Sequence, residues 1–160
     1  MGAYPIRAVS AMAKIAKQAE KDAAAMGAYD GMHYVIDFDD FTNAVCDAAC
    51  TMARDIQADA IITLTNSGRS ARRMSKFRPM QPIVAATPKE KTYHQLALSW
   101  GVYPVLAMVQ QSQDRLFQHA IDCAKQIDLV SEGDKVVICA GVPVGGVTNS
   151  LKVEVLGKRE

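Results

Sequence analysis

The middle of this 160-residue chain alternates short apolar runs with helical patterns, and that alternation limits the fold more than any other feature. The first such unit, Ile61–Ser70, reads as a buried strand, a tight polar turn with one glycine, and the first turn of a helix. The unit recurs, with predicted strands at 60–65, 82–86, 102–108 and 135–140 and predicted helices at about 69–77, 88–100 and 112–127. Strands that alternate with helices in this way form a parallel sheet with right-handed crossovers.

The last connection is too short for such a crossover. Nine residues, Gly141–Asn149, separate the fourth strand from a fifth at about Leu151–Leu156. A parallel crossover needs about a dozen residues or more, so the fifth strand is expected to return antiparallel at an edge. The predicted fold class is therefore α/β, a three-layer sandwich around a five-stranded, mostly parallel sheet with one antiparallel edge strand.

Two helices are predicted before the alternating region. Pro5 suits the first turn of a helix, and Gly27 ends the apolar pattern that follows it. Asp39 or Asp40 can cap a second helix, predicted over 41–56. The predicted organisation is a lead-in helix followed by an α/β domain: 1–26 and 27–160.

Composition excludes several classes of function. The formal net charge is +1, so no overall field would attract nucleic acid or an anionic membrane, and neither is expected as a partner. The apolar runs are far shorter than the roughly 18 residues of a membrane span. The four cysteines form no CxxC or Cys/His grouping, so we interpret them as buried reduced thiols of a cytoplasmic protein and expect no metal in this segment.

The turn Asn66-Ser67-Gly68 is the best candidate for a ligand site. In an open parallel sheet, ligands bind beyond the carboxyl ends of the strands, where this turn lies. Its N–H groups and those of the following helix form a positive concavity suited to an anion. Thr65, Ser67 and Ser70 add hydroxyl groups, and the glycine lets a ligand approach the backbone closely.

Three arginines, Arg69, Arg72 and Arg73, crowd the start of the helix after this turn. The helix dipole makes each cation there unfavourable by about 0.3–1 kcal/mol, and a bound phosphate would reverse the sign of that effect. Arg69 can offer a bidentate fork to such a phosphate. The alternative is that the arginines point to water or pair with acids across a subunit contact, and the sequence leaves both interpretations open.

A second candidate is the glycine-rich loop Gly141–Asn149, which opens on the same edge of the sheet. Gly145 and Gly146 allow it to fold over a ligand in the first turn, although a plain connection to an edge strand would have the same composition. The chain offers no paired carboxylates, no nucleophile with a base and no metal cluster. No catalytic residue is therefore predicted.

Four stretches carry a resemblance to a known family: GAYPIRAVSAM, AIITLTNSGRSARRMSKFRPMQPIVAAT, LALSWGVYPVL and GDKVVICAGVPVGGVTNSLKVEV. With their connections they cover most of the chain, and they resemble the carboxyl-terminal domain of pyruvate kinase. The resemblance implies a regulatory and subunit-interface domain of a homo-oligomeric glycolytic enzyme. That enzyme transfers a phosphoryl group from phosphoenolpyruvate to ADP.

The same resemblance implies an allosteric pocket for a phosphorylated effector. Its residues would be Thr65, Asn66, Ser67, Gly68, Arg69, Ser70, Gly145 and Gly146. The barrel domain that holds the substrates, magnesium and potassium has no counterpart in these residues, so the barrel is an expected partner and the chain alone is expected to be inactive. Met1 is accordingly interpreted as the start of an excised domain or of a gene for a lone domain. A stand-alone domain that binds a phosphorylated metabolite without catalysis is the alternative function.

Three departures from the family's fructose-bisphosphate pattern reduce the positive charge. Asn66 stands where lysine is common, and the Gly141–Asn149 loop carries no basic residue. The family's effector-binding tryptophan and extra arginine are missing between Met108 and Arg115. A bisphosphate would be under-neutralised, so a sugar monophosphate or AMP is favoured as effector, and a purely structural interface without an effector is the further alternative.

Overall fold

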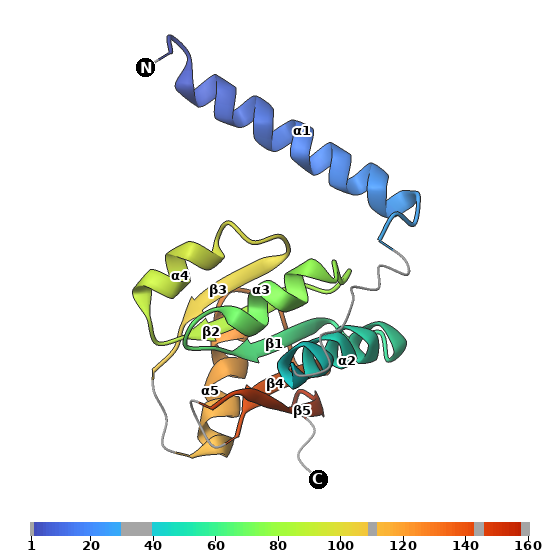
Figure 1. The fold of residues 1–160 in the computed structure, drawn as a ribbon, viewed down its shortest axis with the longest axis vertical. Coiled ribbons are helices and arrows are strands. Elements are labelled where there is room, and N and C mark those ends of the chain that lie inside the picture. The colour runs from blue at the N-terminus through green and yellow to red at the C-terminus, as the bar shows by residue number, and fades with distance from the viewer. Residues whose placement is uncertain (1, 30–39, 109–111, 143–145, 158–160) are drawn as a thin grey trace. The chain divides into compact units, whose positions relative to one another are not determined.

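The computed structural model describes residues 2–29, 40–108, 112–142 and 146–157 (Figure 1). The chain forms two compact units, Met1–Met32 and His33–Glu160. The first unit contains helix α1 (Pro5–Ala25), with the proline in its first turn as predicted. Neither α1 nor any other helix in the described ranges is both long and apolar enough to cross a membrane. The domain boundary between residues 26 and 27 stays a prediction.

The second unit is built on a five-stranded sheet with the order β3-β2-β1-β4-β5. Its strands are β1 (Ala60–Leu64), β2 (Ile83–Thr87), β3 (Val102–Leu106), β4 (Lys135–Gly141) and β5 (Thr148–Val155). β1 pairs in parallel with β2 and β4, β2 pairs in parallel with β3, and β5 pairs antiparallel with β4 at the edge. The predicted α/β fold with one antiparallel edge strand is confirmed.

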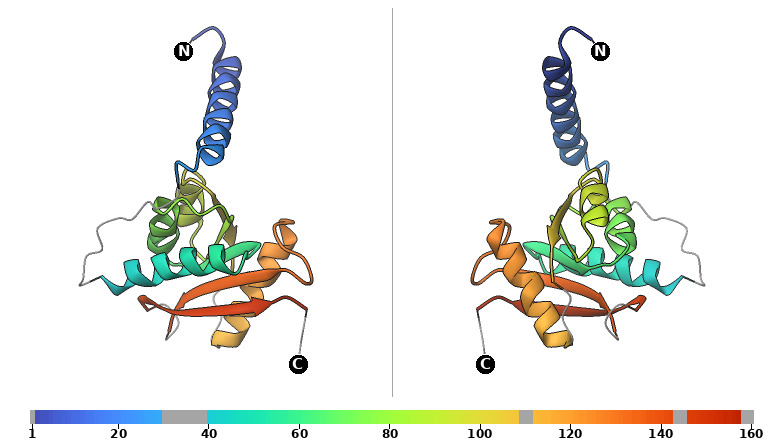
Figure 2. Two further views of the ribbon diagram at one scale, coloured as in Figure 1. Left: turned by 90° about the vertical axis from the view of Figure 1, so that its right-hand side faces the viewer. Right: turned by 90° about the vertical axis from the view of Figure 1, so that its left-hand side faces the viewer.

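Helices cover both faces of this sheet, which gives the three predicted layers (Figure 2). Successive residues of a strand point to opposite faces, and Ile61 and Ile62 of β1 accordingly enter different cores. Ile61 packs with apolar residues of α2 (Phe41–Asp55), α3 (Arg69–Lys76) and α4 (Glu90–Leu96). Ile62 packs with the buried face of α5 (Gln113–Gln126) on the other side.

The start of α4 differs from the prediction. The sequence predicts a capping box at Thr87 with Pro88 as the first helical residue, but Thr87 is the last residue of β2 and pairs with Leu106 of β3. Thr87 Oγ1 accepts from the N–H of Lys89 at 3.3 Å, but the helix begins only after Lys89, which occupies the cap position without a capping side-chain bond. The helix also ends at Leu96, earlier than expected, because the chain turns before it enters β3.

The chain order of the strands places a crevice beside β1. From β1 the chain moves outward through β2 to β3, and it then returns to the other side of β1 to form β4. The connections after β1 and β4 therefore lead away from each other, which is the topological switch point where open α/β sheets bind ligands. Both candidate segments identified in the sequence leave the sheet at this point.

All four cysteines are free and buried, as predicted. Burial raises the pKa of Cys46 and of Cys50 to about 12, and burial also raises the pKa of Cys139. The thiols of Cys46 and Cys50 donate weak hydrogen bonds to the main-chain oxygens of Ser70 and Met74, at 3.7 and 4.0 Å. These thiols therefore help to pack α2 against α3.

We expect Cys46, Cys50 and Cys139 to resist thiol reagents as long as the protein is folded, because they are neither exposed nor ionised. Labelling with a disulfide reagent at about pH 8, followed by mapping of the modified residues, should find them modified only in urea. Cys123, whose pKa is raised less strongly by burial, should react first. Rapid modification of Cys46 without denaturant would contradict this packing.

Candidate anion-binding site

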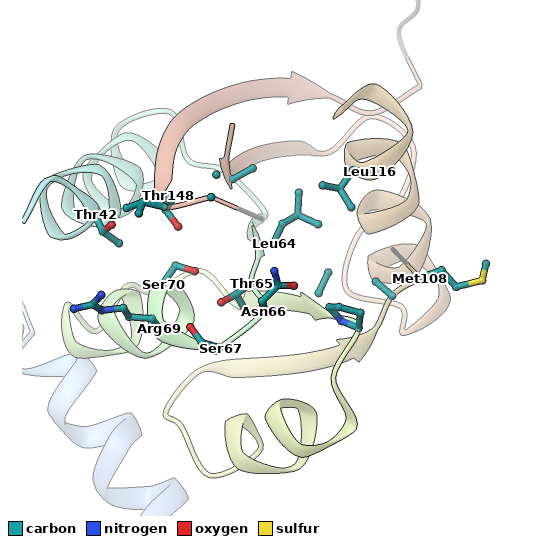
Figure 3. Close-up of a pocket in the computed structure, with 17 residues that line it drawn as sticks. Thr42, Leu64, Thr65, Asn66, Ser67, Arg69, Ser70, Met108, Leu116 and Thr148 are labelled. Atoms are coloured by element: carbon teal, nitrogen blue, oxygen red, sulfur yellow. The ribbon is translucent and has the colours of Figure 1, made fainter. Parts of the chain in front are cut away.

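A cavity of about 540 Å³ opens at the carboxyl ends of the parallel strands, in the crevice beside β1 (Figure 3). The ends of β1, β2 and β4 and the residues after β3 contribute to its lining. Residues from the first turns of α2, α3 and α5, and from the segment entering β5, complete it. The cavity lies wholly within the second unit and has the size of a small-molecule site.

The structure brings most of the predicted site residues to this cavity. The residues among its lining are Thr65, Asn66, Ser67, Arg69, Ser70 and Gly146. Gly68 lies within the same turn but shapes the backbone and does not line the cavity. Gly145 falls outside the described residues.

The turn between β1 and α3 leaves main-chain donors at the cavity. Gly68 precedes α3 with a left-handed φ of 75°, and its N–H donates to Thr65 Oγ1 at 3.0 Å. Glycine has no side chain to cap a helix, so the N–H groups of the first turn of α3 have no capping side-chain acceptor from this position. Together with the positive end of the helix dipole, these groups favour an anion.

Two contacts hold the turn in place from different elements. Thr63 Oγ1 of β1 donates to Ser70 Oγ at 3.0 Å, and both residues are buried. Thr92 Oγ1 of α4 donates to the carbonyl oxygen of Asn66 at 3.1 Å. The position of the donors is therefore set by the sheet and by two helices before any ligand arrives.

The three arginines of α3 have different surroundings. Arg72 Nη2 donates to the carbonyl oxygen of Ser67 at 2.8 Å, so this residue braces the turn. Arg73 forms a bidentate ion pair with Asp40, the residue that precedes α2. Arg69 is exposed, lines the cavity and makes no hydrogen bond or ion pair within the described residues.

This division answers part of the question that the sequence left open. Arg73 does pair with an acid, which was one of the two interpretations, but its partner Asp40 belongs to the same chain and not to another subunit. The hydrogen bonds from Arg73 hold the pKa of the Asp40 carboxyl below its ordinary value, and the charge of Arg69 lowers it further. Arg69 remains as the cavity-lining arginine without a side-chain partner among the described residues, and its guanidinium extends away from Thr65 and Asn66 in Figure 3.

Another wall of the cavity is formed by the end of β4 and by residues 146–148, which lead into β5. The side-chain amide of Asn149 bonds to both main-chain groups of Val142, accepting from its N–H at 2.9 Å and donating to its carbonyl at 2.7 Å. A register shift after Ala140 accompanies this contact. β5 begins at Thr148, earlier than predicted, and Thr148 is buried and lines the cavity.

The cavity also has an apolar part that the sequence analysis missed. Leu64, Ala107, Leu116 and Ala140 line it, and Leu64 and Ala140 belong to the core shared with α5. These residues carry no functional signal, because the same periodicity describes an ordinary core face. A ligand that fits the whole cavity would combine an anionic group with a less polar body.

Metal binding has no support in the described ranges, since no three His, Cys, Asp or Glu side chains come together there in a way that could hold an ion. The magnesium and potassium implied by the family resemblance belong to the barrel domain, and no reaction step is assigned to a metal in this chain.

Comparisons with known proteins agree on one family. Residues 43–154 match the family described as "Pyruvate kinase, alpha/beta domain". Pyruvate kinase of Clostridium acetobutylicum is 40% identical over 169 aligned residues, which cover 97% of this chain and 33% of that protein. Pyruvate kinase 2 of Synechocystis sp. is 38% identical, and the match covers 98% of this chain and 26% of that protein. Pyruvate kinase of Lactobacillus delbrueckii subsp. bulgaricus is 36% identical, and the match covers 99% of this chain and 27% of that protein. The chain thus spans a third or less of the length of these relatives.

Proposed function

The chain belongs to the pyruvate kinase family as its carboxyl-terminal α/β domain, and we propose that it is the regulatory and subunit-interface part of an enzyme that transfers a phosphoryl group from phosphoenolpyruvate to ADP. The chemistry, with its magnesium and potassium, is assigned to a barrel domain that acts together with this one in a homo-oligomer. A stand-alone binding protein is not favoured, because the similar proteins named above are pyruvate kinases.

Within this function, the cavity beside β1 is proposed as the site of a phosphorylated effector. The observation that carries the proposal is that Arg69 lines the cavity at the first turn of α3, the positive end of a helix that has no capping side chain at Gly68. Cations at this end of a helix are unfavourable unless an anion is near. Arg72 and Arg73 have intrachain partners, whereas a bound phosphate would provide one for Arg69.

The ligand is proposed to carry one phosphate. One arginine and one helix N-terminus can neutralise a monophosphate, and Asn66 lines the cavity as a neutral side chain. The apolar part near Leu64 and Leu116 suits the sugar ring or base of the ligand. A sugar monophosphate or AMP therefore fits better than a bisphosphate.

Replacing Arg69 by glutamine should weaken binding of a monophosphate by about tenfold to a hundredfold, because a charge-assisted hydrogen bond contributes roughly 1.5–3 kcal/mol. Isothermal titration of the full chain with glucose 6-phosphate, AMP and inorganic phosphate measures this directly. The matched control is Lys76→Gln, which removes the same charge from an exposed position at the far end of α3. Equal affinities in wild type and Arg69→Gln would show that the proposed site is wrong.

A further inference from the structure

The chain places one of its own carboxylates among the arginines beside the cavity. Asp40 precedes α2 and accepts a hydrogen bond at Oδ1 from the N–H of Asn43, at 3.4 Å. Its two oxygens also accept from the two terminal nitrogens of Arg73, with Nη1 to Oδ1 at 2.7 Å. The side chains of Arg73 and Asp40 are only 15% and 24% exposed, so this ion pair is partly shielded from water. It is a stronger interaction than an ordinary surface pair.

This ion pair lies next to the cavity although neither partner lines it. Arg73 follows Arg69 by one helical turn on α3, and Arg69 is a lining residue. Thr42, two residues after Asp40 in the first turn of α2, is buried and also lines the cavity. Asp40 feels the charge of Arg69, since that charge contributes to the lowered pKa of its carboxyl. A ligand anion beside Arg69 would therefore also feel the charge of Asp40.

We propose that Asp40 determines which effectors the cavity accepts, by limiting it to ligands with a single phosphate. The carboxylate occupies Arg73, which would otherwise be a second cation available near the site, and it adds a negative charge close to Arg69. Both effects disfavour an anion, and they do so in proportion to the charge that the anion carries. This inference rests on the proposed effector site, and it assigns the charge selectivity of that site to a residue outside the cavity.

The test is the substitution Asp40→Asn, which removes the charge but keeps the shape and leaves a good helix cap. We expect affinity for glucose 6-phosphate to rise by about threefold and affinity for fructose 1,6-bisphosphate by about tenfold. A ligand with twice the charge gains about twice the electrostatic free energy, so its fold-change in affinity is about the square of the other. Titration calorimetry at low salt gives both constants, and the gain should shrink as salt screens the charges. An unchanged ratio of the two affinities would overturn the proposal.

Two further variants exclude indirect effects. Asp55→Asn removes the same charge from the exposed end of the same helix and should leave both affinities unchanged. Arg73→Gln leaves Asp40 without its partner, so both affinities should fall, and the bisphosphate affinity should fall more. If Asp40→Asn and Arg73→Gln change the affinities in the same direction, the effect is structural and the proposal fails.

The outcomes also separate this inference from the proposed function. If wild type binds glucose 6-phosphate and Arg69→Gln does not, the effector site stands, and only the Asp40 variants then decide the inference. If wild type binds neither phosphate, or if Arg69→Gln binds as wild type does, the site itself is wrong and the selectivity assigned to Asp40 is overturned with it.

Discussion

Replacing Gly68 by alanine should lower the free energy of unfolding by about 2–4 kcal/mol, the sum of a left-handed backbone penalty of roughly 1–2 kcal/mol and the cost of overpacking. Gly68 has a φ of 75°, and a Cβ there would lie 2.7 Å from Arg72 Nη1 and 3.0 Å from Leu96 Cδ2. Arg72 Nη1 is the end of an exposed side chain and can shift, which strains the bond from Nη2 to the Ser67 carbonyl, whereas Leu96 is fully buried and has less room to move. Urea denaturation followed by circular dichroism measures the loss.

The same substitution should weaken phosphate binding, because a shift of Arg72 strains its bond to the turn that lines the cavity. Gly101→Ala is the matched control, since Gly101 has a φ of 66° but a Cβ there would have no neighbour within 4 Å. It should cost only the backbone penalty of about 1–2 kcal/mol and leave phosphate affinity unchanged. If Gly68→Ala costs no more than Gly101→Ala, the close packing described around the turn is not present in solution.

Most of the fold could be predicted because its elements depend on local patterns. The β-branched runs of β1 and β4 sit between helices with regular apolar spacing, and the short Gly141–Asn149 connection indicates an antiparallel return. The order of the strands is a different matter. The sequence does not say that β4 lies beside β1 and not beside β3, and this placement creates the crevice at the switch point.

The polar turn of the site could also be predicted, since Asn66, Ser67 and Gly68 follow a strand directly and precede a helix. The partners of the arginines could not. Asp40 is 33 residues from Arg73 in the chain, and its helix-capping role gives a complete explanation for an aspartate at that position. A residue that satisfies one local rule gives no sign of a second, long-range contact.

The start of α4 is one boundary that the patterns placed wrongly. Thr87 has the residue type and the spacing of a helix cap, but its backbone continues the ladder with β3. The ladder uses the main chain of Thr87, while its Oγ1 accepts from the N–H of Lys89 at 3.3 Å, a local bond within the turn that precedes the helix. The helix therefore begins later, at Glu90.

Replacing Gly141 by alanine should also be strongly destabilising, by about 1–3 kcal/mol, for a purely steric reason. A Cβ at Gly141 would lie 2.3 Å from the carbonyl oxygen of Gly146 and 2.9 Å from that of Val147. Both atoms belong to the backbone, so neither can rotate away as a side chain would. The first residue of β5, Thr148, pairs with Gly141 and lines the cavity, so it cannot move away from Gly141 without changing the site.

The measurement for Gly141→Ala is amide hydrogen exchange combined with urea denaturation. Exchange should accelerate at Thr148 and Ser150, where β5 pairs with the end of β4, while the amides of β1 and β2 change only as global stability does. Glucose 6-phosphate affinity should fall in the same variant because Thr148 is displaced.

The three glycine substitutions then separate two causes of instability. Gly101→Ala tests backbone conformation alone, Gly141→Ala tests steric contact alone, and Gly68→Ala combines both. If Gly141→Ala were as stable as wild type with unchanged exchange at Thr148, the close approach of Gly146 and Val147 to Gly141 would be wrong, and with it this wall of the proposed effector site.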